Sequence, residues 1–128
     1  MDKVKFELEF IVNSSPKIIY NCLSTPSGLS EWFADDVNIK GDVFTFIWEG
    51  SEEQAKLLTK KRDEFVKFQW MEQLEEGLKT YFELRIKIDA MTNERAIIVT
   101  GFADEDEVEE AKALWETQIN ELKHILGG

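Results

Sequence analysis

The feature that most constrains the fold is an imbalance between many strand-like segments and one long helix. From position 3 to about position 103, apolar residues alternate with polar ones or form short runs between turn residues, which is typical of strands. After that point the period changes to the three- and four-residue spacing of an amphipathic helix, in a stripe made of Val108, Ala111, Trp115, Ile119, Leu122 and either Ile125 or Leu126. One helix therefore has to cover the apolar face of a whole sheet.

The width of such a sheet predicts that it bends. Six or seven strands at ~4.8 Å spacing make a sheet on the order of 30 Å wide, whereas one helix covers only about 10–12 Å. We therefore predict an α+β fold in which a curved antiparallel sheet wraps around the C-terminal helix, helped by strand twist and by glycine or bulged turns. Space should remain at one end of the wrap, filled either by large side chains or by a guest molecule.

Turn signals and periodicity place the individual elements. Short connections make successive strands antiparallel neighbours, and the strands are predicted at Lys3–Val12, Val37–Ile39, Val43–Trp48, Gln54–Arg62, Phe65–Met71, Thr80–Ile88 and Arg95–Ala103.

Two short helices are predicted between the first two strands. Ser15 and Thr25 can each accept a backbone N–H at a helix start, and each precedes a proline, which suits the first helical position. The first helix should span Pro16–Leu23, and the second should carry Leu29, Trp32 and Phe33. The acidic segment Asp104–Glu110 suits the first turn of the long helix, which Gly127-Gly128 should end.

Length and charge restrict the class of protein. The 128 residues suit one domain spanning residues 1–128. The 26 acidic and 15 basic residues give a formal net charge of −11, which repels nucleic acid phosphates, so no nucleic-acid partner is expected. Cys22 has no second cysteine to pair with, no apolar run approaches the roughly 20 residues of a membrane-spanning helix, and Met1-Asp2-Lys3 does not begin a signal peptide. We predict a cytoplasmic protein without membrane insertion.

The sequence offers no recognisable catalytic or metal-binding set. His124, the single histidine, lies near the end of the long helix, where a cation complements the helix dipole. Cys22 has the apolar neighbours Ile18, Ile19 and Leu23 and is interpreted as a small buried residue. One Cys and one His cannot form an ordinary zinc site, the acidic clusters lack calcium-loop spacing, and no phosphate-binding glycine loop occurs. We assign no catalytic residue, metal ligand or cofactor.

Aromatic residues are the most informative candidates for a binding site. Large rings can line a cavity, and tryptophan adds an N–H that orients a guest, but the same rings can instead fill the core. The candidate ligand-binding residues are Trp32, Phe33, Phe44, Phe46, Trp48, Phe68, Trp70, Phe82, Trp115 and Ile119. The strand Val43–Trp48 is apolar on both sides, which indicates that another element or a second subunit covers its second side.

Five local motifs, in order, resemble one known family. They are Phe10–Pro16, Leu29–Phe33, Gly41–Phe44, Phe68–Trp70 and Trp115–Leu122. The chain resembles the START-like, or SRPBCC, superfamily with its helix-grip fold, and especially the branch related to activators of the heat-shock chaperone ATPase. It departs from the branch pattern at Asp42, where a second glycine is common, and in the acidic segment after Trp70.

The resemblance implies a range of functions. Members of the superfamily bind lipids, sterols, polyketides or other apolar molecules, some catalyse reactions in the cavity, and some bind proteins; no fixed catalytic set carries over. Our leading hypothesis is noncatalytic binding of a small apolar ligand, lipid-like or aromatic, between the C-terminal helix and the sheet. The alternatives are a protein-interaction adaptor, chaperone-associated or homodimeric, and an enzyme that uses the same cavity.

Overall fold

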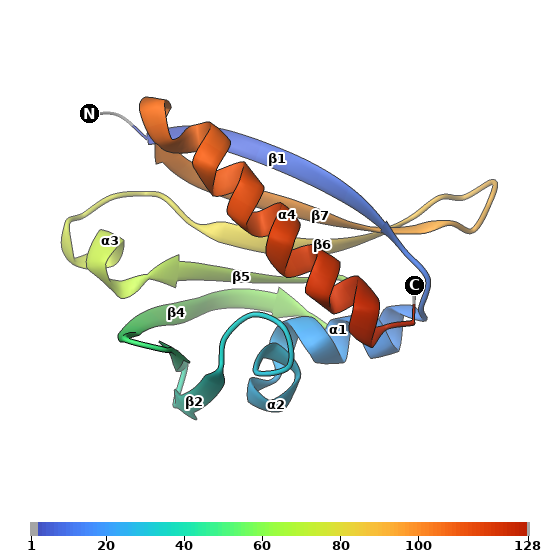
Figure 1. Cartoon of the computed structure of the whole chain (residues 1–128), viewed down its shortest axis with the longest axis horizontal. Helices are drawn as coiled ribbons and strands as arrows, with labels where there is room; N and C mark the ends of the chain where they lie inside the picture. Colours follow the sequence, from blue (N-terminus) through green and yellow to red (C-terminus); the bar gives the residue numbers. More distant parts are fainter. Residues whose placement is uncertain (1–2, 128) are drawn as a thin grey trace.

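The computed structural model describes residues 3–127, so Met1, Asp2 and Gly128, the last of which was predicted to help end the long helix, lie outside the described residues. Seven antiparallel strands form one sheet in the order β1-β7-β6-β5-β4-β3-β2 (Figure 1). The strands are β1 (Lys3–Val12), β2 (Asp36–Lys40), β3 (Val43–Trp48), β4 (Ser51–Lys61), β5 (Phe65–Trp70), β6 (Phe82–Ile88) and β7 (Arg95–Asp104). The predicted α+β fold is confirmed.

The connection between β1 and β2 joins the two edges of the sheet. It contains the helices α1 (Pro16–Ser24) and α2 (Pro26–Leu29). Both are capped as predicted, because the Ser15 hydroxyl accepts from the Ile18 N–H at 3.3 Å and the Thr25 hydroxyl accepts from the Gly28 N–H at 2.9 Å. The two helices are tightly packed, since a Cβ added to Gly28 would lie 2.3 Å from the Asn21 carbonyl oxygen.

Two local predictions were wrong. Trp32 and Phe33 do not belong to the second helix, which ends at Leu29; the chain continues in hydrogen-bonded turns, with the Phe33 N–H donating to the Leu29 carbonyl at 2.9 Å. These turns bury both aromatic rings. Met71 does not extend the strand before it but begins a short helix, α3 (Met71–Glu75), in a segment of good helix formers.

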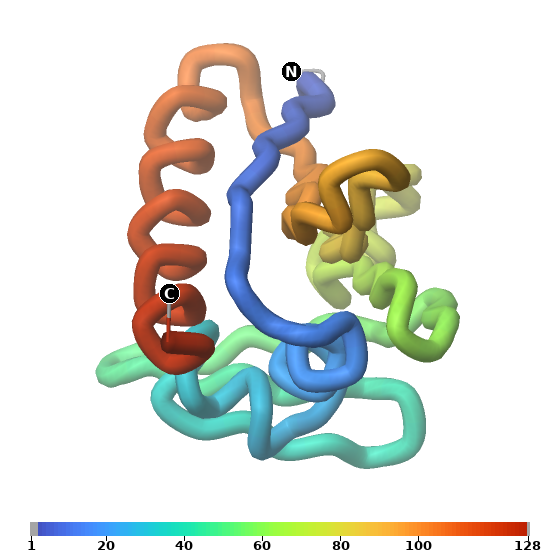
Figure 2. The backbone as a smooth tube through the Cα atoms, turned by 90° about the vertical axis from the view of Figure 1, so that its right-hand side faces the viewer, coloured from blue at the N-terminus to red at the C-terminus, as the bar shows by residue number. Residues whose placement is uncertain are grey.

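The sheet bends around the long helix α4 (Val108–Ile125), which follows a short 3₁₀ helix, η1 (Glu105–Glu107). In Figure 2 the strands β2–β4 run beneath α4, while β1 passes alongside it. A bulge contributes to the bend, because the β4–β5 register shifts between Leu57 and Thr59. We call the side of the sheet that faces α4 the concave face and the other side the convex face.

The core lies between α4 and the concave face. Ile119 and Leu122 of α4 are completely buried and belong to one cluster with Phe44, Phe46 and Phe68. Leu126 rather than Ile125 ends the apolar stripe of α4, because Leu126 packs against this cluster and Ile125 is 43% exposed. No helix among residues 3–127 has the length and apolarity needed to cross a membrane.

β3 is the strand whose sequence is apolar on both sides, and its convex side is only partly covered. Phe44 and Phe46 are buried on the concave side, whereas Val43, Thr45 and Ile47 are only half-buried on the convex side. Their paired neighbours on that side are polar residues of β2 and β4, namely Asp36, Asn38, Lys40, Glu52, Gln54 and Lys56. Adjacent polar side chains therefore cover this side in part.

Candidate functional site

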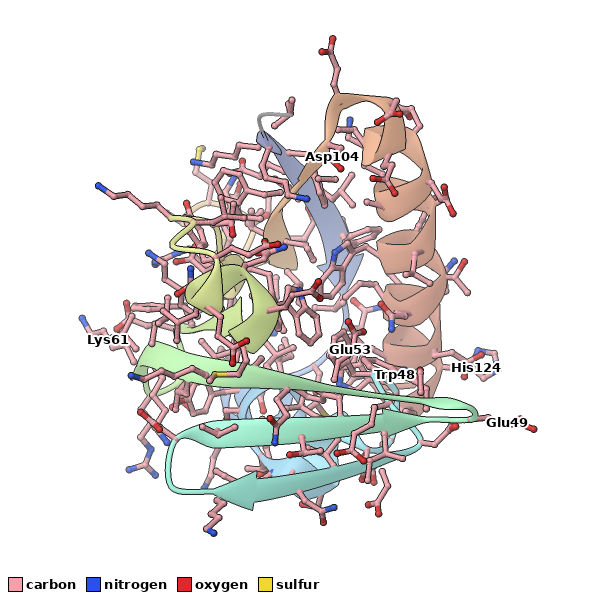
Figure 3. The ribbon with its side chains drawn as sticks, turned by 90° about the vertical axis from the view of Figure 1, so that its left-hand side faces the viewer. Trp48, Glu49, Glu53, Lys61, Asp104 and His124 are labelled. Carbon is pink, nitrogen blue, oxygen red and sulfur yellow. The ribbon has the colours of Figure 1, made fainter. Side chains whose placement is uncertain are left out.

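A cavity of about 400 Å³ lies between α4 and the concave face. Aromatic rings make up most of its wall: Phe6, Phe33, Trp48, Trp70, Tyr81, Phe82, Phe102 and Trp115. Ala111 and Leu114 of α4 complete the apolar part, and four polar side chains also line it: Ser51, Glu53, Gln73 and Gln118. Figure 3 shows Trp48 and Glu53 on the side of the sheet that faces α4.

Phe33 is the centre of the aromatic wall. Its ring centroid lies 4.9 Å from that of Phe46, 5.6 Å from that of Trp48 and 5.5 Å from that of Trp115. Its carbonyl oxygen accepts hydrogen bonds from the Trp48 indole N–H at 2.9 Å and from the Gln118 amide at 3.1 Å. The turn after α2 is thereby attached to both β3 and α4, which keeps the wall in one arrangement.

The four tryptophans differ in whether their indole N–H is already used. Trp32 donates to the Cys22 carbonyl at 2.8 Å, and Trp48 donates to Phe33. Trp70 and Trp115 line the cavity, and neither indole N–H has an acceptor among residues 3–127. Both N–H groups reach solvent, since Arg95 Nε is the one buried side-chain nitrogen or oxygen without a partner among residues 3–127, and both are available to a guest molecule.

The structure divides the ten predicted ligand-binding residues into two groups. Five line the cavity: Phe33, Trp48, Trp70, Phe82 and Trp115. The other five belong to the buried core: Trp32, Phe44, Phe46, Phe68 and Ile119. The second group packs behind the wall. For example, the ring centroids of Phe46 and Trp70 lie 5.8 Å apart.

Sequence reasoning missed several lining residues that come from distant strands. Phe6 pairs across β1 and β7 with Gly101, and a Cβ on Gly101 would lie 2.8 Å from the Phe6 ring. A glycine inside a strand pattern is the one signal that could have indicated this close approach. Leu114, 60% exposed at the rim of the cavity, lies off the apolar stripe of α4 and gave no signal.

The charge at the cavity is negative. Among residues 3–127, Glu53 is the one charged residue that lines it, and it stands on the concave face opposite Phe46. Depressions that adjoin the mouth share Glu53 and Trp70 with the cavity and add four more carboxylates, from Glu52, Glu72, Glu75 and Glu76. Lys3 also lies there, and its ammonium group is 3.1 Å from the Asp104 carboxylate.

The remaining candidate groups lie outside the cavity. His124 is exposed in the last turn of α4 and points away from the sheet (Figure 3). Cys22 is buried, and burial together with the charge of Glu31 raises the pKa of its thiol, so the reactive thiolate is disfavoured. Residues 3–127 contain no group of three or more His, Cys, Asp or Glu side chains that could hold a metal ion.

Comparison with known proteins identifies relatives of the whole chain. The family model of the START-like superfamily domain matches residues 1–128. A search of curated proteins found no match. The solution structure of BfR322 from Bacteroides fragilis is 31% identical, with 98% of this chain and 92% of that chain covered and a TM-score of 0.68.

Two less similar structures share the fold. The Aha1 dimer from Colwellia psychrerythraea is 20% identical, with 96% of each chain covered and a TM-score of 0.81. MLL2253 from Mesorhizobium loti is 15% identical, with 97% of each chain covered and a TM-score of 0.79.

Proposed function

The chain belongs to the START-like superfamily, and from this membership together with its cavity we propose that it binds a small apolar molecule between α4 and the concave face, without catalysing a reaction. The observation that carries the proposal is the aromatic wall around open space, with two indole N–H groups that have no acceptor among residues 3–127. Rings that only filled a core would leave no such space.

The size and chemistry of the cavity suit a guest of modest size. Its volume of about 400 Å³ falls within the range of ligand pockets, roughly 300–1,000 Å³. Mostly apolar walls with a few polar groups are the usual composition of such sites, because apolar burial supplies affinity and the polar groups fix orientation. The N–H groups of Trp70 and Trp115 would fix the orientation here.

A pair of matched substitutions on α4 tests the proposal. Ala111 lines the cavity, whereas Ala113 is exposed and does not. Ala111→Phe should fill part of the cavity, and Ala113→Phe should leave it open. The protein and both variants would be purified from the cells that naturally make the chain, and native mass spectrometry followed by solvent extraction would identify any bound molecule.

We expect an apolar molecule in the wild-type protein and in Ala113→Phe, and its loss from Ala111→Phe. Circular dichroism would establish that both variants are folded. A wild-type protein that carries no small molecule, or a guest that remains equally bound in Ala111→Phe, would contradict the proposal.

A second candidate is association with a protein or with a second copy of the chain. The half-buried Val43 and Ile47 on the convex side of β3 favour it, and the similar Colwellia protein is described as a dimer. Sedimentation velocity should then show a dimer that Ile47→Lys disrupts, and a monomer at all accessible concentrations would exclude self-association. This association is a proposal. The cytoplasmic location is a proposal too, and the buried, unpaired Cys22 is compatible with it.

A further inference from the structure

We infer that the cavity selects a guest with a positive charge: a small organic ammonium ion with an apolar body. This inference rests on the proposed function and adds the charge of the guest to it. Three observations carry it: the sign of the charge in the wall, the aromatic faces around it, and the carboxylates at the mouth.

The described part of the wall contains a carboxylate and no cation. Glu53 is exposed, and none of the ion pairs among residues 3–127 includes it. No Lys, Arg or His lines the cavity in this part of the chain. An anionic guest, such as a fatty acid, would bring a second negative charge beside Glu53 with no partner for either. An ammonium ion would give Glu53 the partner that the described residues do not supply.

The aromatic wall is suited to the same charge. Trp70 and Phe82 have ring centroids 4.9 Å apart, and Trp115 lies 5.9 Å from Phe82. A cation over the face of such rings is attracted by their electron-rich surface, most strongly over tryptophan, and desolvation inside a cavity increases the attraction. Quaternary ammonium groups are commonly recognised by aromatic cages of this kind.

Two cations of the chain already use this interaction. The Lys67 ammonium lies 4.1 Å from the ring centroid of Tyr81, which is part of the cavity wall, and on the convex face the Arg85 guanidinium lies 4.3 Å from that of Phe65. Among residues 3–127 no corresponding cation covers Trp48, Trp70 or Trp115. Their faces are therefore available to a cation supplied by a guest.

The mouth of the cavity would attract cations and repel anions. Glu52, Glu72, Glu75 and Glu76 line depressions that adjoin the mouth, with Glu52 on the convex side of β4, and the nearby Lys3 is paired with Asp104. The net charge of −11 adds a long-range field of the same sign.

Three probes that share one apolar body isolate the effect of charge. Each carries a 2-naphthylethyl group, which ends in trimethylammonium, in a hydroxyl or in a carboxylate. Calorimetric titration of the wild-type protein at low ionic strength should give the tightest binding for the ammonium probe, by about five- to tenfold over the alcohol. The carboxylate should bind more weakly than the alcohol.

Two charge-neutralising variants assign the preference to the cavity. Glu53→Gln should remove most of the advantage of the ammonium probe over the alcohol. Glu7→Gln changes the net charge equally at an exposed position paired with Thr100 on the convex face, and it should keep the advantage.

The outcomes separate this inference from the proposed function. If the alcohol or the carboxylate binds as tightly as the ammonium probe, or if Glu53→Gln keeps the full preference, the inference is overturned and apolar binding stands. If none of the three probes binds, the inference is overturned, and if the natively purified protein is also empty, the proposed function is overturned with it.

Discussion

At the scale of single residues, a few backbone contacts hold the turns in place. Asp89 is the clearest case, because its carboxylate accepts hydrogen bonds from the Met91 N–H at 2.9 Å and the Thr92 N–H at 3.0 Å in the turn between β6 and β7. The bond from Thr92, followed by that from Met91, lowers the pKa of this carboxyl group. The ionised form therefore stabilises the folded chain.

The Asp89 contribution should depend on pH in a defined direction. A carboxyl group whose pKa is lowered by folding contributes its full stability above its unfolded pKa of about 3.9 and loses it as the pH falls through the lower folded value. We expect Asp89→Asn to reduce the free energy of unfolding at pH 7, with a difference from wild type that is constant down to about pH 4 and smaller below it. Urea unfolding between pH 7 and pH 3 measures the difference.

Glu94→Gln is the matched control for Asp89→Asn. It removes one negative charge from the same connection, and the Glu94 side chain accepts no hydrogen bond from residues 3–127. Its difference from wild type should not show the same pattern with pH. If the Asp89→Asn difference does not shrink in acid, the turn hydrogen bonds do not depend on the ionised carboxylate.

At the scale of elements, α4 joins the core on one side and the rim of the cavity on another. Leu122 is completely buried, whereas Leu114 is 60% exposed at the rim. Leu122→Ala should lower the free energy of unfolding by about 2–5 kcal/mol, because it deletes a packed side chain. Leu114→Ala should lower it by less than about 1 kcal/mol, because little packing is lost.

Chemical denaturation of the two alanine variants measures both values with the same substitution in one helix. Equal losses would mean that the buried side of α4 is assigned incorrectly. Leu114→Ala should also change the affinity for a guest, since this side chain lines the cavity.

The elements show which parts of the fold could be predicted from sequence patterns. Periodicity predicted the stripe through Ile119 and Leu122, and capping residues predicted the starts of α1 and α2, because these signals are local. The strand pattern before Met71 concealed α3, whose five residues are too few to show a helical period. The contact between Phe6 and Gly101 depends on the pairing of strands 95 positions apart, which no local pattern specifies. Half of the predicted binding residues consequently lie behind the wall of the cavity.

At the scale of the whole molecule, negative charge is the dominant property of the surface. The chain has 26 acidic residues, and most of them are not among the five ion pairs found in residues 3–127. Exposed ion pairs contribute little to the free energy of unfolding, so added salt should mainly screen the repulsion between like charges. Raising NaCl from about 0.05 M to about 0.5 M should increase the free energy of unfolding by about 1 kcal/mol.

Urea titrations at the two salt concentrations test the effect of screening. The double variant Glu75→Gln/Glu76→Gln removes two of the clustered charges and should show a smaller response to salt. A wild-type stability that does not change or that falls with added salt would show that repulsion is not the dominant electrostatic contribution.

The pairing of β1 with β7 has a consequence for how the chain matures on the ribosome. Residues 3–12 are synthesised well before their partners, residues 95–104. Until those residues emerge, Phe6 and Val12 have no strand to pack with, and the nascent chain carries an unprotected β edge. Completion of the sheet is therefore delayed until residues 95–104 have been made.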